Sequence, residues 1–435
     1  MNTKVCKFGG TSLANAEQFK KVRAIIEADP SRRVIVLSAP GKRNDNDQKI
    51  TDLLLVCQEL ADQGLEIEPV FNRIRERFIE IVEELKISID IIELLNETER
   101  LIIDTPIKAF VASRGEYLSA KVFAAWIDAE FIEPAETIVF RNEEHICPST
   151  YPKLSKRIGE TGLYVVPGFY GADENGLIKI FPRGGSDITG AITARAVEAD
   201  VYENWTDVSG FLMADPRIVN NPESIKELTY KELRELSYMG ATVLHDEAIF
   251  PVRDVGIPIE IKNTNKPSAR GTRIVSSREP SERIVTGIAG LKNFVMFQIE
   301  KTLMNKMVGF GRNVLQIFES RNISYDHTPT GIDTMSVVVR ADNLGDKLDL
   351  VIDDINRTIE PDRIDIVSNL AIIATVGVGM VHHVGTAGKL FTALADEGIN
   401  IRIIDQGSSE INIIVGVNNK DYEKTINAIY RTFVK

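Results

Sequence analysis

Hydrophobic and polar positions in the first part of the chain predict strands joined by helices. The runs VCKFGG and RRVIVLSA have the pattern of buried strands, and EQFKKVRAIIEA between them has the spacing of an amphipathic helix. This βαβ order favours a parallel sheet with helices on both faces. Residues 53–103 are mostly helical in pattern, and ADENG marks a hairpin turn between two further strands.

The pattern changes after residue 280, where two small α+β modules repeat. VLQIFESRNISYDHTPTGIDTMSVVVRAD aligns on LFTALADEGINIRIIDQGSSEINIIVGVN, so that Ile323 matches Ile399 and Val339 matches Val415. Each copy has the order strand, helix, strand, strand, helix, with a further strand to close it. A polar stretch, KPSARGTRIVSSREPSERI, precedes the repeat. We therefore expect one α/β domain over residues 1–278 and two modules over residues 292–367 and 368–435.

Length and charge limit the classes of function. The chain has 435 residues, which is more than one core usually serves, and a formal net charge of −12. An acidic chain is unsuited to general binding of nucleic acids or anionic membranes. The three cysteines form no CxxC pair, and we find no signal peptide and no apolar run of 18 residues. We expect a cytoplasmic protein with reduced thiols and no metal site of its own.

Two glycine-rich turns carry the first chemical signal. KFGGTS places Lys7 before Gly9 and Gly10, where a strand meets a helix, and RGGSD places Arg183 before a second glycine pair. Glycines let a backbone approach a phosphate, and the helix N-terminus behind them favours an anion. Either motif alone is equally compatible with an ordinary turn. Together they indicate two ends of one site for a polyanion.

Three further stretches are ambiguous when taken alone. RGEYLSA (residues 113–120 with its leading serine) fits a functional site or a salt pair on a helix surface. NWTDVSGFLMADPR (204–217) fits a ligand-binding turn or a plain loop. SAPGKRNDNDQKITDLL (38–55) suits a lid or a plain surface loop. The catalytic motifs HRD, GxSxG and HExxH are absent from the sequence. A carboxylate acceptor is already ionised at neutral pH and needs no base, so these features fit a kinase that forms an acyl phosphate.

KFGGTS, RGEYLSA, RGGSD, WTDVSG…DPR and GATVLHDEAI, in this order, resemble the aspartate kinases of the amino-acid kinase family. The resemblance covers almost the whole chain. It implies a sheet sandwiched by helices and two ACT-like modules with a ferredoxin-like fold, the second completed by a strand from residues 283–291. It also implies ATP and Mg²⁺ as cofactors and L-aspartate as the substrate.

The resemblance assigns roles to individual residues. Lys7 would stabilise the transferring phosphoryl group, with Asp187 as the second catalytic residue, which together with Ser186 orders the junction. Glu116 would hold the α-ammonium of aspartate and Arg183 its α-carboxylate, in a pocket lined by Ser38 and Thr51. The backbone of Gly9 and Gly10 would cradle ATP phosphates. The residues assigned to the remainder of the nucleotide site are Thr206, Asp207, Asp215, Arg217 and Thr242.

Two positions depart from the family pattern, and both concern ATP. Thr242 stands where relatives often have a lysine that contacts phosphate, and Leu212 replaces an aromatic residue before DPR. The ACT-like modules imply feedback by an amino-acid effector, lysine first and threonine next. The candidate region is the loop over residues 326–336, for which the sequence fits a simple hairpin equally well. They also imply a homo-oligomer, a dimer or higher.

Three other functions compete with this interpretation. The first is another amino-acid kinase, acting on glutamate or N-acetylglutamate, and with an N-acetylated substrate, which has no α-ammonium, Glu116 would lose its proposed role. LAIIATVGVGMVHHVG (370–385) resembles the start of a dinucleotide fold, but His382 occupies the third glycine position and too little chain follows. A non-catalytic amino-acid sensor would not be expected to keep Lys7, Glu116, Arg183 and Asp187 together.

Overall fold

A computed structural model describes residues 2–142, 145–182, 184–241, 243–244, 246–279 and 283–434. Contacts between Cα atoms divide the chain into two compact units. The first unit contains Met1–Phe211, Ser224–Leu233 and Thr242–Arg278, and the second contains Leu212–Glu223, Arg234–Ala241 and Glu279–Lys435. The domain limits that we derived from the sequence stay a prediction.

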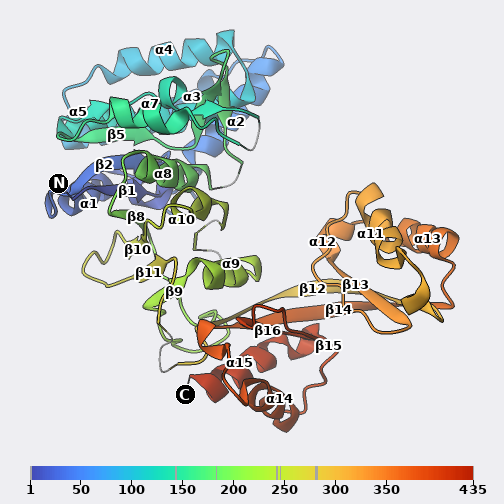
Figure 1. Ribbon diagram of the computed structural model, residues 1–435. Coiled ribbons are helices and arrows are strands. Elements are labelled where there is room, and N and C mark those ends of the chain that lie inside the picture. The colour runs from blue at the N-terminus through green and yellow to red at the C-terminus, as the bar shows by residue number, and fades with distance from the viewer. Residues whose placement is uncertain are drawn as a thin grey trace. The chain divides into compact units, whose positions relative to one another are not determined.

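An eight-stranded sheet forms the centre of the first unit, in the order β3-β5-β2-β1-β8-β10-β11-β9 (Figure 1). All neighbouring strands are parallel except β10 and β11. The strand order reverses at β1, which lies between β2 and β8, and ligands of parallel sheets bind beyond the carboxyl ends of strands at such a point. The strands are β1 (Lys4–Phe8), β2 (Arg32–Leu37), β3 (Glu130–Phe131), β5 (Tyr164–Pro167), β8 (Val201–Thr206), β9 (Glu227–Thr229), β10 (Ile259–Asn263) and β11 (Thr272–Val275).

Helices cover both faces of this sheet, as the βαβ pattern predicts. On one face α1 to α5 share a hydrophobic core with side chains of β1, β2 and β8, among them Phe8, Leu37 and Trp205. On the other face α8 packs against β1 and β8. The helices are η1 (Gly10–Leu13), α1 (Ala16–Glu27), α2 (Ile50–Asp62), α3 (Glu68–Leu85), α4 (Ile91–Asp104), α5 (Lys108–Ile127), α6 (Pro134–Thr137), α7 (Thr150–Arg157), α8 (Gly185–Ala196), α9 (Tyr230–Tyr238), η2 (Asp246–Ile249) and α10 (Phe250–Arg253).

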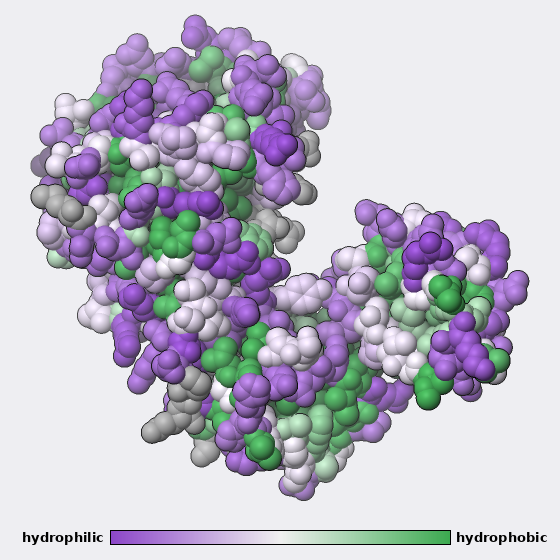
Figure 2. Space-filling model, viewed as in Figure 1, coloured by the Kyte–Doolittle hydropathy of each residue, from purple (hydrophilic) through white to green (hydrophobic). Residues whose placement is uncertain are grey.

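A small second sheet of β4 (Val139–Phe140), β6 (Tyr170–Asp173) and β7 (Ile178–Ile180) completes the first unit. β6 and β7 are antiparallel, which confirms the hairpin predicted at ADENG. Hydrophilic side chains predominate on the visible face of this unit (Figure 2). Within the described residues, no helix is long and apolar enough to cross a membrane.

The second unit contains one antiparallel sheet of five strands, in the order β13-β12-β14-β16-β15 (Figure 1). Two strands of 14 residues, β12 (Gly287–Glu300) and β14 (Arg363–Val376), run through both halves of this sheet. Helices α11 and α13 pack together on one half, and α14 and α15 pack together on the other. The remaining elements are η3 (Met304–Lys306), α11 (Phe310–Ser320), β13 (Thr334–Arg340), α12 (Ala341–Leu344), α13 (Leu348–Ile359), η4 (Val378–Met380), α14 (Thr386–Asp396), β15 (Ile403–Asp405), β16 (Asn412–Asn418), η5 (Asn419–Asp421) and α15 (Tyr422–Phe433).

The repeat differs between its copies at one point. Copy two has β15 after its first helix, whereas the matching segment of copy one forms only isolated bridges, from His327 to Val338 and from Thr330 to Met335. The strand expected in copy one is therefore wrong for the described residues. β14 is antiparallel to β12 and β16, which agrees with our rejection of a dinucleotide fold there, because that fold starts with parallel strands.

Candidate functional site

The turn after β1 brings Lys7 and its glycines to the carboxyl end of the sheet. The amide of Gly9 donates to the carbonyl of Trp205 at 3.1 Å, and the amide of Gly41 donates to the carbonyl of Gly10 at 2.8 Å. A Cβ atom on Gly10 would lie 2.9 Å from the carbonyl oxygen of Ala39, closer than such atoms normally approach. A side chain at position 10 would therefore force the two loops apart, so the glycine is required for this close approach.

Lys7 pairs with Asp187 at this end of the sheet. The two residues are 180 positions apart in sequence, yet Lys7 Nζ lies 2.5 Å from Asp187 Oδ1. Both side chains are largely buried, with exposed fractions of 10% and 16%. The structure thus brings together one residue from each glycine-rich motif. A buried ammonium with a single carboxylate partner keeps N–H donors for a second anion.

The second glycine-rich turn begins helix α8. Gly184 precedes the helix with φ of 69°, a left-handed conformation that favours glycine. Ser186 is buried and packs against Gly168, where a Cβ atom would lie 2.6 Å from the serine Oγ. Asp187 follows in the first turn of α8. Arg183, the predicted partner of the substrate carboxylate, lies outside the described residues.

Glu116 lies in the middle of α5 and is buried, with 6% of its surface exposed. Its Oε2 atom has no hydrogen-bond partner among the described residues. Burial raises the pKa of Glu116 to about 8, although the amide of Ala39 and the charges of Lys7 and Arg114 act against this. A buried carboxylate without a partner is costly, and a cationic ligand would relieve that cost.

Arg114, two residues before Glu116 on α5, is also buried, and its guanidinium lies 4.5 Å from the ring centroids of Phe110 and Tyr117. The alternative of a surface salt pair at RGE is therefore wrong, since both charged residues are buried. We did not predict from the sequence that two aromatic rings surround Arg114. The helical spacing of Phe110, Arg114 and Tyr117 in KAFVASRGEY could have suggested it.

Ser38 and Thr51 lie at the two ends of the loop that follows β2. The amide of Ser38 donates to the carbonyl of Phe8 at 3.2 Å, which ties the start of this loop to β1, and Thr51 is in the first turn of α2. The loop is anchored inside the unit because buried Arg77 reaches Asp47 at 2.6 Å and the Gly41 carbonyl at 3.1 Å. Residues 42–46, 48 and 49 are nevertheless exposed, so the alternatives of a lid and a plain surface loop both stay open.

The predicted nucleotide residues are divided between the two units. Thr206 ends β8, its hydroxyl donates to Asp207 at 3.2 Å, and Asn263 donates to the Asp207 carbonyl at 3.2 Å. Asp215 and Arg217 belong to the second unit, where they pair at 2.6 Å. The hydrogen bond from Arg217 lowers the pKa of Asp215. Thr242 lies outside the described residues.

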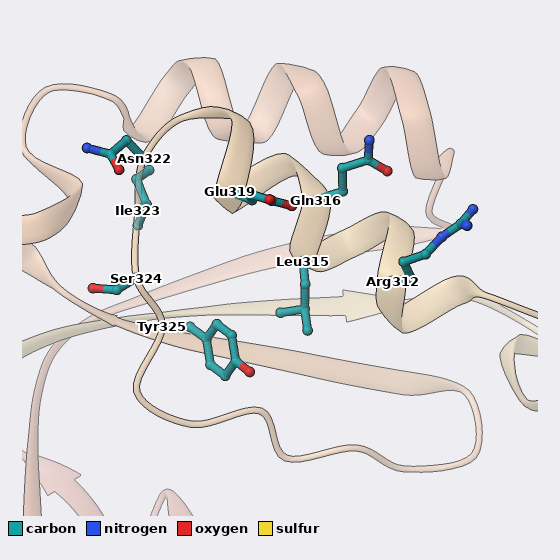
Figure 3. Close-up of a pocket in the computed structure, with 8 residues that line it drawn as sticks. All are labelled: Arg312, Leu315, Gln316, Glu319, Asn322, Ile323, Ser324 and Tyr325. Atoms are coloured by element: carbon teal, nitrogen blue, oxygen red, sulfur yellow. The ribbon is translucent and has the colours of Figure 1, made fainter. Parts of the chain in front are cut away.

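A separate pocket of about 940 Å³ occurs in the second unit, beside α11 (Figure 3). Figure 3 shows Leu315, Gln316 and Glu319 on the helix and Ser324 and Tyr325 on the loop after it. The pocket contains none of the residues that we assigned to phosphoryl transfer. It adjoins the start of the loop that we named as the effector region.

Comparisons with known proteins show the family to which the chain belongs. The profile of the amino acid kinase family matches residues 2–263, and the profile of an ACT domain matches residues 373–433. The chain belongs to the amino acid kinase family. It is 39% identical to aspartokinase 3 of Bacillus subtilis, over 99% of this chain and 98% of that protein. Within the family it therefore belongs with the aspartokinases.

Solved structures of aspartate kinases are also similar to this chain. The aspartate kinase of Clostridium acetobutylicum matches with a TM-score of 0.92 and 49% identity over all of both chains. Aspartokinase III of E. coli matches with 25% identity over all of both chains, at TM-scores of 0.77 with aspartate and ADP bound and 0.76 with lysine and aspartate bound. Family membership and the mixed α/β fold with an ACT domain confirm the resemblance stated from the sequence.

Proposed function

We propose that this protein transfers the γ-phosphoryl group of ATP to the side-chain carboxylate of L-aspartate, giving 4-phospho-L-aspartate and ADP. The observation that carries the proposal is the combination of the Lys7–Asp187 pair with the buried carboxylate of Glu116, whose Oε2 has no hydrogen-bond partner among the described residues, in the same unit. The first suits an anionic phosphoryl group, and the second suits the ammonium of an amino acid. The aspartokinase relatives support the choice of aspartate.

Each residue has a role in this mechanism that follows from its chemistry. Lys7 neutralises charge on the phosphoryl oxygens during transfer, and Asp187 holds the lysine in place. Glu116 accepts the substrate ammonium, and Arg183 binds the α-carboxylate with its planar guanidinium. The acceptor carboxylate attacks phosphorus while the bond to the β-phosphate oxygen breaks, and no proton has to be removed. Ser38, Thr51 and Ser186 line the substrate end.

The nucleotide end uses backbone as well as side chains. Gly10 offers its amide to a phosphate, and Gly9, whose own amide donates to the Trp205 carbonyl, leaves space for the phosphate beside it. Thr206, Asp207 and Thr242 of the same unit contact the rest of the nucleotide. Mg²⁺ enters with ATP and offsets the charge of its phosphates. The described residues contain no group of three or more His, Cys, Asp or Glu that could hold a metal ion. An ion coordinated mainly by phosphates is compatible with that donor set.

Regulation belongs to the second unit in this proposal. Asp326 Oδ2 and His327 Nε2 are buried without a hydrogen-bond partner among the described residues, at the start of the loop over residues 326–336. Such atoms suit a polar ligand. An amino-acid effector, lysine first, would supply both an ammonium and a carboxylate. A homo-oligomer formed through the ACT-like modules is also part of the proposal. The free cysteines Cys6, Cys57 and Cys147 suit the reducing cytoplasm.

The activity is tested by measuring ADP formation with L-aspartate, L-glutamate and N-acetyl-L-glutamate, and by trapping the acyl phosphate with hydroxylamine. We expect turnover with aspartate, inhibited by lysine in the same assay. Turnover with N-acetylglutamate but not with aspartate would contradict the proposal. An absence of turnover with all three acids would favour a non-catalytic sensor.

Replacing Lys7 tests the phosphoryl end of the site. Lys7→Ala removes the ammonium that faces the transferring group, so we expect turnover to fall roughly 1,000-fold. Lys20→Ala, at an exposed position of α1, is the matched control and keeps the activity of the wild type. Near-normal turnover of Lys7→Ala would reduce KFGGTS to a structural turn.

A further inference from the structure

Strand β8 presents two different sets of side chains to its two faces. Glu203 and Trp205 meet the side chains of β1 on the face covered by α1 to α5, where Phe8 stacks on Trp205 at 5.9 Å. Tyr202 and Asn204 point to the opposite face, because side chains alternate along a strand. That face is covered by α8, which carries Asp187.

Asn204 contacts the catalytic pair directly. Its Nδ2 atom donates to Asp187 Oδ1 at 2.8 Å, and the same oxygen lies 2.5 Å from Lys7 Nζ. Lys7 and Asn204 are paired in register on neighbouring parallel strands, so the sheet holds both donors on one side of the carboxylate. Asn204 is only 2% exposed, which means that its amide has no access to competing water.

Tyr202 holds the backbone of the same residue. Its hydroxyl donates to the carbonyl oxygen of Asp187 at 3.0 Å, and the ring is fully buried. The helix makes room for it at Gly190, where a Cβ atom would lie 2.5 Å from the tyrosine Oη and 2.7 Å from ring carbons. Glycine inside a helix costs stability, so its presence here accompanies a contact that no larger residue would permit.

We propose that Tyr202 and Asn204 act as a clamp that positions the Asp187 carboxylate, and through it the Lys7 ammonium, for phosphoryl transfer. Both are positioning residues that do not touch the substrates. The inference rests on the proposed function, because it assigns a consequence for turnover to a contact within that site.

The physical reason is the freedom that the pair would otherwise have. A carboxylate can rotate about its χ2 bond, and a lysine ammonium can follow it through four rotatable bonds. The Asn204 amide fixes Oδ1, and the Tyr202 hydroxyl fixes the carbonyl in the first turn of α8. The ammonium is then held at one point at the end of β1 when the charged phosphates arrive. Small misplacements of such a group cost large factors in rate.

The test compares Asn204→Leu and Tyr202→Phe with the wild type and with Thr193→Val. Thr193 is a fully buried residue of α8 whose hydroxyl has no partner among the described residues, so its replacement perturbs the helix without touching Asp187. We expect Asn204→Leu to lower kcat by roughly 10- to 100-fold, with KM for ATP and aspartate within about twofold. Tyr202→Phe, which keeps the ring, lowers kcat by roughly threefold. Thr193→Val leaves kcat unchanged.

A double-mutant cycle separates positioning from general stability. In an Asp187→Asn background, Asn204→Leu should cause no further loss of single-turnover rate, because the amide would act only through the carboxylate. Equal losses in both backgrounds would overturn this inference and leave the proposed function intact. The same holds if Asn204→Leu has the kcat of the wild type. If Asn204→Leu does not fold, Asn204→Ala removes the amide without adding a charge and gives the same comparison. A folded wild-type protein that does not turn over aspartate would overturn the proposed function, and this inference with it.

Discussion

Two buried carboxylates in the first unit, Glu203 and Glu116, have opposite surroundings. Glu203 is fully buried and contacts Arg32 at 2.8 Å, the Trp205 indole at 2.9 Å, Lys4 at 3.5 Å and the Cys6 thiol at 3.4 Å. Glu116 is almost as buried, but its Oε2 has no hydrogen-bond partner among the described residues. One carboxylate is satisfied by the fold, and the other keeps an oxygen without a partner, as the proposed role in binding an ammonium requires.

Their pKa values differ in the same sense. Burial alone would raise the pKa of Glu203, but the hydrogen bond and charge of Arg32, with the Trp205 N–H and Lys4, bring it below the ordinary value. Burial dominates at Glu116 and raises its pKa to about 8. The difference teaches that burial of an acid does not mark a functional site by itself. What distinguishes the two is that Glu116 has no cationic side chain bonded to it and that its Oε2 has no hydrogen-bond partner among the described residues.

The largest expected effect concerns the satisfied carboxylate. Glu203→Gln removes the negative charge that pairs with Arg32, which leaves this largely buried guanidinium without an ion-pair partner, whereas Lys4 keeps Asp29. We expect the free energy of unfolding to fall by roughly 3–5 kcal/mol, measured by urea denaturation at pH 7. Glu116→Gln is the matched control and should not lose stability. Equal losses for both variants would remove the distinction between the two sites.

Glu116→Gln should instead weaken the binding of aspartate. The neutral amide cannot pair with an ammonium, so we expect KM for aspartate to rise roughly 100-fold while KM for ATP stays unchanged. Steady-state kinetics at saturating ATP measure this. An unchanged KM for aspartate would mean that the ammonium binds elsewhere.

Glu116 should also make the stability of the wild type depend on pH in a defined direction. The raised pKa of Glu116 means that the folded protein keeps a proton that the unfolded chain has lost. The stability contributed by Glu116 is full below about pH 4.3 and is lost as pH rises through about 8. Glu116→Gln should remove this part of the decline, which thermal unfolding across pH 5–9 would reveal. A decline identical to that of the wild type would contradict the raised pKa.

The smallest effect is a proton released on binding. Because the pKa of Glu116 is about 8, its carboxyl is mostly protonated at pH 7, and an arriving ammonium favours the ionised form. Calorimetric titration of aspartate in two buffers of different ionisation enthalpy should give nearly one proton released, and none for Glu116→Gln. Proton uptake, or no difference between the buffers, would contradict this mechanism.

Sequence patterns predicted much of the first unit and less of the second. The βαβ start, the hairpin at ADENG and the glycine turns follow from periodicity and local conformation, and the structure has them. Periodicity did not reveal that β12 and β14 each run through both halves of one sheet, because strand length depends on pairing with distant segments. The missing strand of copy one has the same cause.

The candidate site divides in a similar way. Motifs pointed to Lys7, Asp187 and Glu116, but spacing could not tell that RGE is buried, since the layer that covers α5 comes from other parts of the chain. Asn204 was part of a quoted motif and received no role. Only the register with Lys7 and the packing of α8 reveal its contact with Asp187.

The central claim is that Glu116 recognises the ammonium of aspartate in a kinase that phosphorylates the side-chain carboxylate. The most direct measurement compares kcat/KM for L-aspartate and for succinate, which lacks the amine, in the wild type and in Glu116→Gln. We predict that the wild type prefers aspartate by roughly 100-fold and that Glu116→Gln loses most of this preference. Equal use of both acids by the wild type, or an undiminished preference in the variant, would contradict the account.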